Sequence, residues 1–339
     1  MTRADLCAGI LWAGATAYAL FGGADFGAGF WDLVAGGAER GERPRGLIQR
    51  SLTPVWEANH VWLIFILVVL WTAFPPAFSA VMTTLYVPIA LAAVGIVLRG
   101  SGFAFRKSIE GLSGRRAAGA TFAISSLLTP FFMGAVVGAI ADGNVPADGN
   151  GAPFSSWLQP LPLLTGAMFV ASGAYLSAVF LIGDARRAGD DELERYFARR
   201  ALGAAGVAGV AAAFGLVELH AETHYVFDRL IHQGLPLVVL SALCGVGVLV
   251  ALVSSARRPA AGSSRLLRPL AAGAVIAVIW GWGVAQFPYL LPTSLKISEA
   301  AAPPDTLATV IVVFIVAAIL VLPALGLLYW LSQKELLGE

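Results

Sequence analysis

The chain has 339 residues, of which 58% are hydrophobic and only 13% are charged, and its mean hydropathy is +0.78. Because soluble domains carry about 25% charged residues, this composition excludes a soluble globular protein and indicates an integral membrane protein. The net charge of +1 gives no reason to expect a nucleic-acid partner. Cys7 and Cys244 both lie in apolar stretches and predict no disulfide framework.

Apolar stretches of about 20 residues, separated by short polar joints, predict an all-α fold rather than a β-barrel. We expect about nine transmembrane helices, over residues 6–35, 53–74, 77–104, 117–141, 160–183, 201–219, 234–254, 269–290 and 306–331.

The basic residues predict how these helices are oriented. Of the 22 Lys and Arg residues, 18 fall in alternate joints, namely 36–52, 105–116, 184–200, 255–268 and the C-terminal tail. Positively charged loops of membrane proteins stay on the cytoplasmic side. We therefore predict a multi-pass membrane protein with its N-terminus outside and its C-terminus in the cytoplasm.

Matching helix orientations divide the chain into two four-helix units plus one additional helix. The first unit is predicted over 1–141 and the second over 160–290, with an external loop at 142–159 between them. A further external loop and the ninth helix occupy 291–339.

The first span contains G-A-D-F-G-A-G, residues Gly23 to Gly29. Gly23 and Gly27 form a small-xxx-small pair, which lets another helix approach closely. Asp25 lies between them. Two explanations remain open: the motif serves helix packing and Asp25 is simply hydrogen-bonded within it, or Asp25 has a functional role.

The second span begins with T-P-V-W-E-A-N-H-V-W-L, which places Glu57, Asn59 and His60 in an apolar helix. A charged group near a helix centre costs about 2.5–3.5 kcal/mol, so such residues usually face a bundle interior or a water-filled path. Glu57 and His60 are three residues apart and are expected to share a helix face, framed by Trp56.

Arg99, near the end of the third span, completes a set of polar residues at similar depth. Counting along the helices at 1.5 Å per residue places Asp25, Glu57 and Arg99 in the cytoplasmic half of the membrane. This arrangement predicts a proton or ion entry path, or an internal salt-bridge network.

Two further clusters lie toward the outer side. His220 and His224 are four residues apart, a spacing that allows metal binding. They lie at the membrane surface, where charged residues cost little, and we predict no metal site there. Gln286, followed by two prolines, predicts a break near the end of the eighth span.

The motifs together resemble subunit II of the cytochrome bd-type quinol oxidases from the first span to the last. The resemblance is carried by G-A-D-F-G-A-G, P-V-W-E-A-N-H-V-W-L, L-R-G-S-G-F-A-F-R at 98–106, and W-G-V-A-Q-F-P-Y-L-L-P in the eighth span. The family commonly has W-D-G-N where this chain has Trp56-Glu57-Ala58-Asn59, so the carboxylate is kept on an arm one methylene longer.

The resemblance implies a haem-free subunit of an enzyme that oxidises quinol and reduces O2 to water. Haems b558, b595 and d and the quinol site would belong to subunit I, the partner. The acid at Glu57 would supply protons from the cytoplasm, with Asp25, Asn59, His60 and Arg99 as its neighbours. Some members hold a quinone as a structural lipid, for which Trp56 is the candidate contact, and a small single-helix subunit is a further candidate partner.

Two other functions are compatible with parts of the sequence. A proton-coupled secondary transporter would suit acids in the membrane and broken helices, but it needs substrate-binding residues in both halves, and the second half has almost no charged residue deep in its spans. A di-iron protein would use Glu57-x-x-His60, but such sites need a second E-x-x-H motif and two further glutamates.

Overall fold

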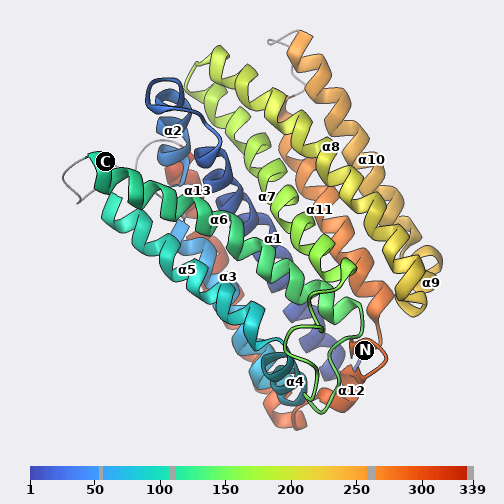
Figure 1. Ribbon diagram of the computed structural model, residues 1–339. Coiled ribbons are helices and arrows are strands. Elements are labelled where there is room, and N and C mark those ends of the chain that lie inside the picture. Colours follow the sequence, from blue (N-terminus) through green and yellow to red (C-terminus); the bar gives the residue numbers. More distant parts are fainter. Residues whose placement is uncertain (53–55, 107–111, 258–263, 334–339) are drawn as a thin grey trace.

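The computed structural model describes residues 1–52, 56–106, 112–257 and 264–333. Within these residues the chain is almost entirely helical, and the helices form an elongated bundle (Figure 1). The prediction of an all-α membrane protein is confirmed.

Within the described residues, eight helices are long and apolar enough to cross a membrane. They are α1 (Arg3–Leu33), α3 (Trp56–Ala73), α6 (Leu112–Ala141), α7 (Pro160–Arg187), α8 (Asp191–Glu222), α10 (Leu235–Arg257), α11 (Ser264–Gln286) and α13 (Pro304–Gln333). They match eight of the nine predicted spans, and α11 ends at Gln286, where the sequence predicted a break.

The third predicted span, 77–104, differs from the expectation because it is not one straight helix. It is built from α4 (Pro75–Thr84) and α5 (Tyr86–Arg106), which meet at an angle of 86°. Leu85 lies between them, and Pro88 has no N–H to donate to the carbonyl of Thr84. Counting this bent pair as one span gives up to nine crossings within the described residues.

Short elements fill the joints between the long helices. At one end of the bundle α2 (Ala38–Leu52) follows α1 and contains the arginines of the first basic joint. At the other end lie α9 (His224–His232), α12 (Ile297–Ala300) and a small antiparallel sheet. Its strands β1 (Tyr289–Leu291) and β2 (Leu295–Lys296) pair Tyr289 with Lys296 and Leu291 with Leu295.

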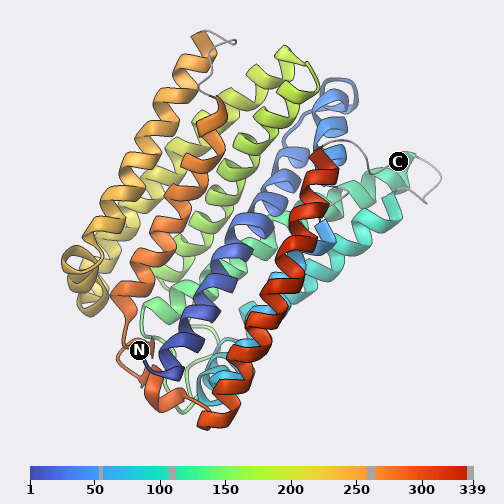
Figure 2. The same cartoon turned by 180° about the vertical axis from the view of Figure 1, so that it is seen from behind.

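Helix α1 lies in the middle of the bundle, packed against α3, α6 and α7 (Figures 1 and 2). Helices α8 and α10 form one edge, while α3 and α13 lie toward the other. Gly27 allows the closest approach of α1 to α7, because a Cβ there would lie only 2.0 Å from the carbonyl oxygen of Gly173. The division into two four-helix units stays a prediction.

Candidate functional site

Four helices bring polar side chains together inside the bundle. Asp25 comes from α1, His60 from α3, Arg99 from α5 and Ser126 from α6. Arg99 Nη1 donates to Asp25 Oδ2 at 2.7 Å, and Nη2 donates to the backbone carbonyl of Asp25 at 3.1 Å. Nε of Arg99 donates to Ser126 Oγ at 3.0 Å. The side chains of Arg99 and Asp25 are 2% and 0% exposed, so this is a fully buried ion pair.

Two aromatic rings enclose the guanidinium group. Arg99 Cζ lies 4.7 Å from the ring centroid of Phe26 and 5.0 Å from that of Phe122. A guanidinium over an aromatic face is stabilised by the ring quadrupole, most strongly where water is excluded. The rings and the hydrogen bonds together hold Arg99 in one place.

His60 borders the ion pair without being part of it. Its Nε2 lies 3.5 Å from Arg99 Nη1, at the limit of a hydrogen bond. Because arginine can only donate, this contact suits an Nε2 lone pair and assigns the imidazole proton to Nδ1. His60 Nδ1 and Asp25 Oδ1 are buried and have no hydrogen-bond partner among the described residues. A donor and an acceptor are therefore both available beside the ion pair.

The structure brings together three of the predicted residues, Asp25, His60 and Arg99, at similar depth. Asn59 is also buried, with 3% exposure, on the same helix as His60. The ring of Trp56 stands edge-on to His60, with 6.5 Å between centroids. Residues 53–55, which precede Trp56 in the predicted motif, lie outside the described residues.

Glu57 is placed differently from the expectation that it shares a face with His60. Its side chain is exposed, whereas His60 is half-buried against α5. Positions three apart on a helix differ by about 60° in direction, which is enough to separate an inward from an outward residue. Glu57 instead begins an exposed row of α3, and the apolar members of that row are Val61, Ile64, Val68 and Trp71.

Sequence reasoning missed the contribution of α6. Ser126 and Phe122 contact Arg99 from a span that carries no charge at this level. The Ser125–Ser126 pair in an apolar stretch was the available signal, since a hydroxyl inside a membrane usually has a hydrogen-bond partner.

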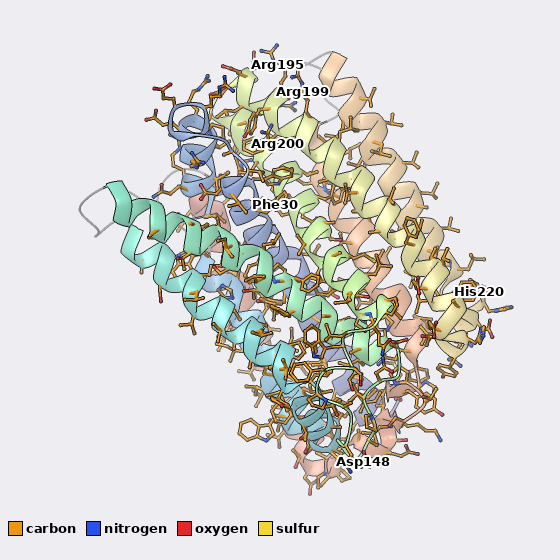
Figure 3. The ribbon with its side chains drawn as sticks, in the orientation of Figure 1. Phe30, Asp148, Arg195, Arg199, Arg200 and His220 are labelled. Atoms are coloured by element: carbon orange, nitrogen blue, oxygen red, sulfur yellow. The ribbon has the colours of Figure 1, made fainter. Side chains whose placement is uncertain are left out.

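The outer histidine pair lies where α8 ends and α9 begins, and the absence of a metal site there stays a prediction. The rings of His220 and His224 lie 5.9 Å apart between centroids, and His220 is at the surface (Figure 3). Over the described part of the chain, no group of three or more potential metal ligands occurs.

Comparisons with known proteins agree over nearly the whole chain. The family model for cytochrome bd terminal oxidase subunit II matches residues 4–332. A Bacillus subtilis chain bearing the name of a cytochrome bd menaquinol oxidase subunit II is 22% identical over 345 residues, covering 98% of this chain and 96% of the relative. Subunit 2 of the Escherichia coli cytochrome bd-I ubiquinol oxidase is 25% identical over 313 residues, covering 84% and 80%. A chain of the bd oxidase from Geobacillus thermodenitrificans superposes with a TM-score of 0.82 at 26% identity, over 98% of both chains.

Proposed function

The chain belongs to the cytochrome bd terminal oxidase subunit II family, and from this premise we propose that its buried polar cluster supplies protons to the oxidase. Reduction of O2 to water by quinol consumes protons, which must reach a site inside the membrane. The observation that carries the proposal is His60 beside the buried Asp25–Arg99 pair, one helical turn from Glu57. The comparisons give no support to the transporter alternative.

The partner, subunit I, would cover the face of α3 that carries Glu57. Val61, Ile64, Val68 and Trp71 are 49%, 62%, 51% and 64% exposed in this chain. The neighbouring α13 is also largely uncovered, with Ile319 and Leu320 both 66% exposed. A carboxylate at the head of an apolar face is unfavourable against lipid, but it is useful in an interface through which protons pass.

Within this interface the polar residues would have different roles in proton transfer. Glu57, at the first turn of α3, would take protons from the cytoplasm. His60 would pass them on, because its Nδ1 is not held by another described group. Asp25 and Arg99 would remain a fixed ion pair that sets the local field, and Asn59 would orient its neighbours. This order rests on the proposed orientation, with the basic joints and the C-terminus in the cytoplasm.

The haems would belong to subunit I. His60 Nε2 faces the guanidinium of Arg99 at 3.5 Å, an arrangement that does not suit an axial ligand of haem iron. A structural quinone would lie against Trp56 at the edge of the same face. A small single-helix subunit is a further proposed partner.

The experiment is to replace Glu57 by Gln and by Asp in the assembled oxidase. Glu57→Gln keeps shape and hydrogen bonding but removes the titrating group. It should lower quinol-oxidase turnover and proton uptake while haem content stays normal, and Glu57→Asp should retain much of the activity. Glu42→Gln, a change of another exposed acid on α2, serves as the control.

Normal turnover in Glu57→Gln would refute the proton-supply role. Loss of the haems together with activity would instead assign Glu57 to assembly of the two subunits. The proposal requires that only turnover and proton uptake fall.

A further inference from the structure

Three arginines gather at the end of α8 that faces the basic joints: Arg195, Arg199 and Arg200 (Figure 3). Arg195 Nε donates to the backbone carbonyl of Asp191 at 3.2 Å. The guanidinium of Arg200 lies 3.3 Å from the ring centroid of Tyr196 and 5.9 Å from that of Trp31. Arg195 and Arg199 are exposed and Arg200 is half-buried.

Four of the nearby carboxylates are engaged with other arginines, and Asp191 at the start of α8 is exposed. Arg43 pairs with Asp190 and Glu192, Arg186 with Glu194, and both Arg187 and Arg268 with Asp184. Among the described residues, no carboxylate forms an ion pair with Arg195, Arg199 or Arg200. This end of α8 therefore presents positive charge that an external anion could neutralise.

The arginines lie at the depth of lipid headgroups. The stretch from Ala201 to Val217 contains no charged residue and, at 1.5 Å per residue, spans about 25 Å, close to the thickness of the hydrocarbon core. Arg199 and Arg200 immediately precede it. Tyr196, which lies half-buried beside Arg200, is of a residue type enriched at the membrane interface, whereas Trp31 is buried in the bundle.

Two exposed apolar rows continue from the arginines down the helix. Leu202, Val210 and Val217 follow Arg199 on one face and are 40%, 57% and 62% exposed. Val207 and Phe214 follow Arg200 and are 62% and 60% exposed. Residues seven or eight apart on a helix lie nearly in line, so each arginine stands at the head of a row that would contact acyl chains.

We propose that this end of α8 binds an anionic phospholipid, with the phosphate between Arg199 and Arg200 and the acyl chains along the two rows. The positive charge of the arginines matches an anionic headgroup, and the apolar rows that continue from them match acyl chains. An acidic protein segment would instead need a polar surface along α8 next to the arginines. Clusters of basic residues at the membrane surface attract anionic lipid headgroups. The inference is independent of the proton-supply role of Glu57, because α8 lies at the opposite edge of the bundle from α3 (Figures 1 and 2).

The test is native mass spectrometry of the assembled oxidase, titrated with phosphatidylglycerol or with phosphatidylcholine. Arg199→Gln and the double variant Arg199→Gln/Arg200→Gln are compared with Arg50→Gln, an exposed arginine of α2 at the same end of the bundle. Affinity for one phosphatidylglycerol molecule should fall about fivefold for each arginine removed at α8. Phosphatidylcholine binding should be unchanged. Because Arg199 is exposed, Arg199→Gln should fold normally. This single variant therefore still tests the proposal if the double variant fails to fold.

Equal phosphatidylglycerol binding by all variants, or an equal loss in Arg50→Gln, would overturn the proposal. Displacement of the lipid by glycerol phosphate at equal concentration would also overturn it, because the site would then recognise an anion without its acyl chains. Capture of an acidic protein in place of lipid, lost in Arg199→Gln, would assign the surface to a protein partner instead.

Discussion

Arg99 is bound to both the side chain and the backbone of Asp25, through 2.7 Å and 3.1 Å hydrogen bonds to the carboxylate and the carbonyl oxygen. The two bonds tie α5 to a defined point of α1. This pair is the feature on which the stability of the cluster most depends.

The first prediction concerns the removal of one member of this ion pair. Arg99→Leu should destabilise the protein by about 3–5 kcal/mol, because it leaves the Asp25 carboxylate buried without its counter-ion. Asp25→Asn in the same chain should restore much of the loss. Thermal unfolding of the detergent-solubilised oxidase measures both, and a double variant no more stable than Arg99→Leu alone would contradict the coupling.

The second prediction concerns helix packing at Gly27. Gly27→Ala should destabilise the protein by about 1–3 kcal/mol, because the new Cβ would lie 2.0 Å from the carbonyl oxygen of Gly173. Gly9→Ala on the same helix is the matched control, since nothing lies within 4 Å of its Cβ position. It should be neutral or slightly stabilising. Similar unfolding temperatures for the two variants would show that α1 and α7 do not approach so closely.

The third prediction concerns Asp142, just beyond α6 on the side of the 142–159 loop. Burial raises the pKa of Asp142 above its usual value, and nearby Glu222 also raises it, against hydrogen bonds from Thr223 and Asn144. An acid with a raised folded pKa contributes stability below its unfolded pKa and loses that contribution as the pH rises through the folded pKa. Asp142→Asn should therefore raise the unfolding temperature at neutral pH and have little effect near pH 4.

Asp148 provides the opposite case in the same loop. Hydrogen bonds from the backbone and side chain of Asn150 lower the pKa of Asp148. Its contribution is present above the unfolded pKa and lost as the pH falls through the folded pKa, so Asp148→Asn should lower the unfolding temperature at neutral pH. If Asp142→Asn and Asp148→Asn changed the unfolding temperature at neutral pH in the same direction, the pKa directions assigned to these two acids would be refuted.

The fourth prediction concerns topology. In a chain with Cys7 and Cys244 replaced by Ala, a cysteine at Asp148 should react with a membrane-impermeant thiol reagent applied to intact cells. A cysteine at Glu42, which is exposed on α2, should react only after the membrane is opened. Labelling of both from the same side would remove the cytoplasmic origin of the proposed proton route.

The sequence alone determined the spans and the polar residues inside them. Both depend on position along one helix, which residue counting measures directly: apolar runs of about 20 residues fit the bilayer, and Asp25, His60 and Arg99 can be placed at similar depth by counting. The motifs around these residues were also sufficient for the family resemblance. What a count along one helix cannot supply is the rotation of that helix or the identity of its neighbour.

The tertiary structure decided those relations. The Asp25–Arg99 pair joins residues 74 positions apart, and the role of Ser126 follows only from α6 packing behind α5. The outward direction of Glu57 follows from the packing of α3 on α1, which turns His60 inward and leaves the neighbouring face, which carries Glu57, uncovered. The bend at Leu85 could not be predicted from hydropathy, because a straight and a bent apolar segment have the same hydropathy. The missing N–H of Pro88 breaks a backbone hydrogen bond only in a segment that is already helical.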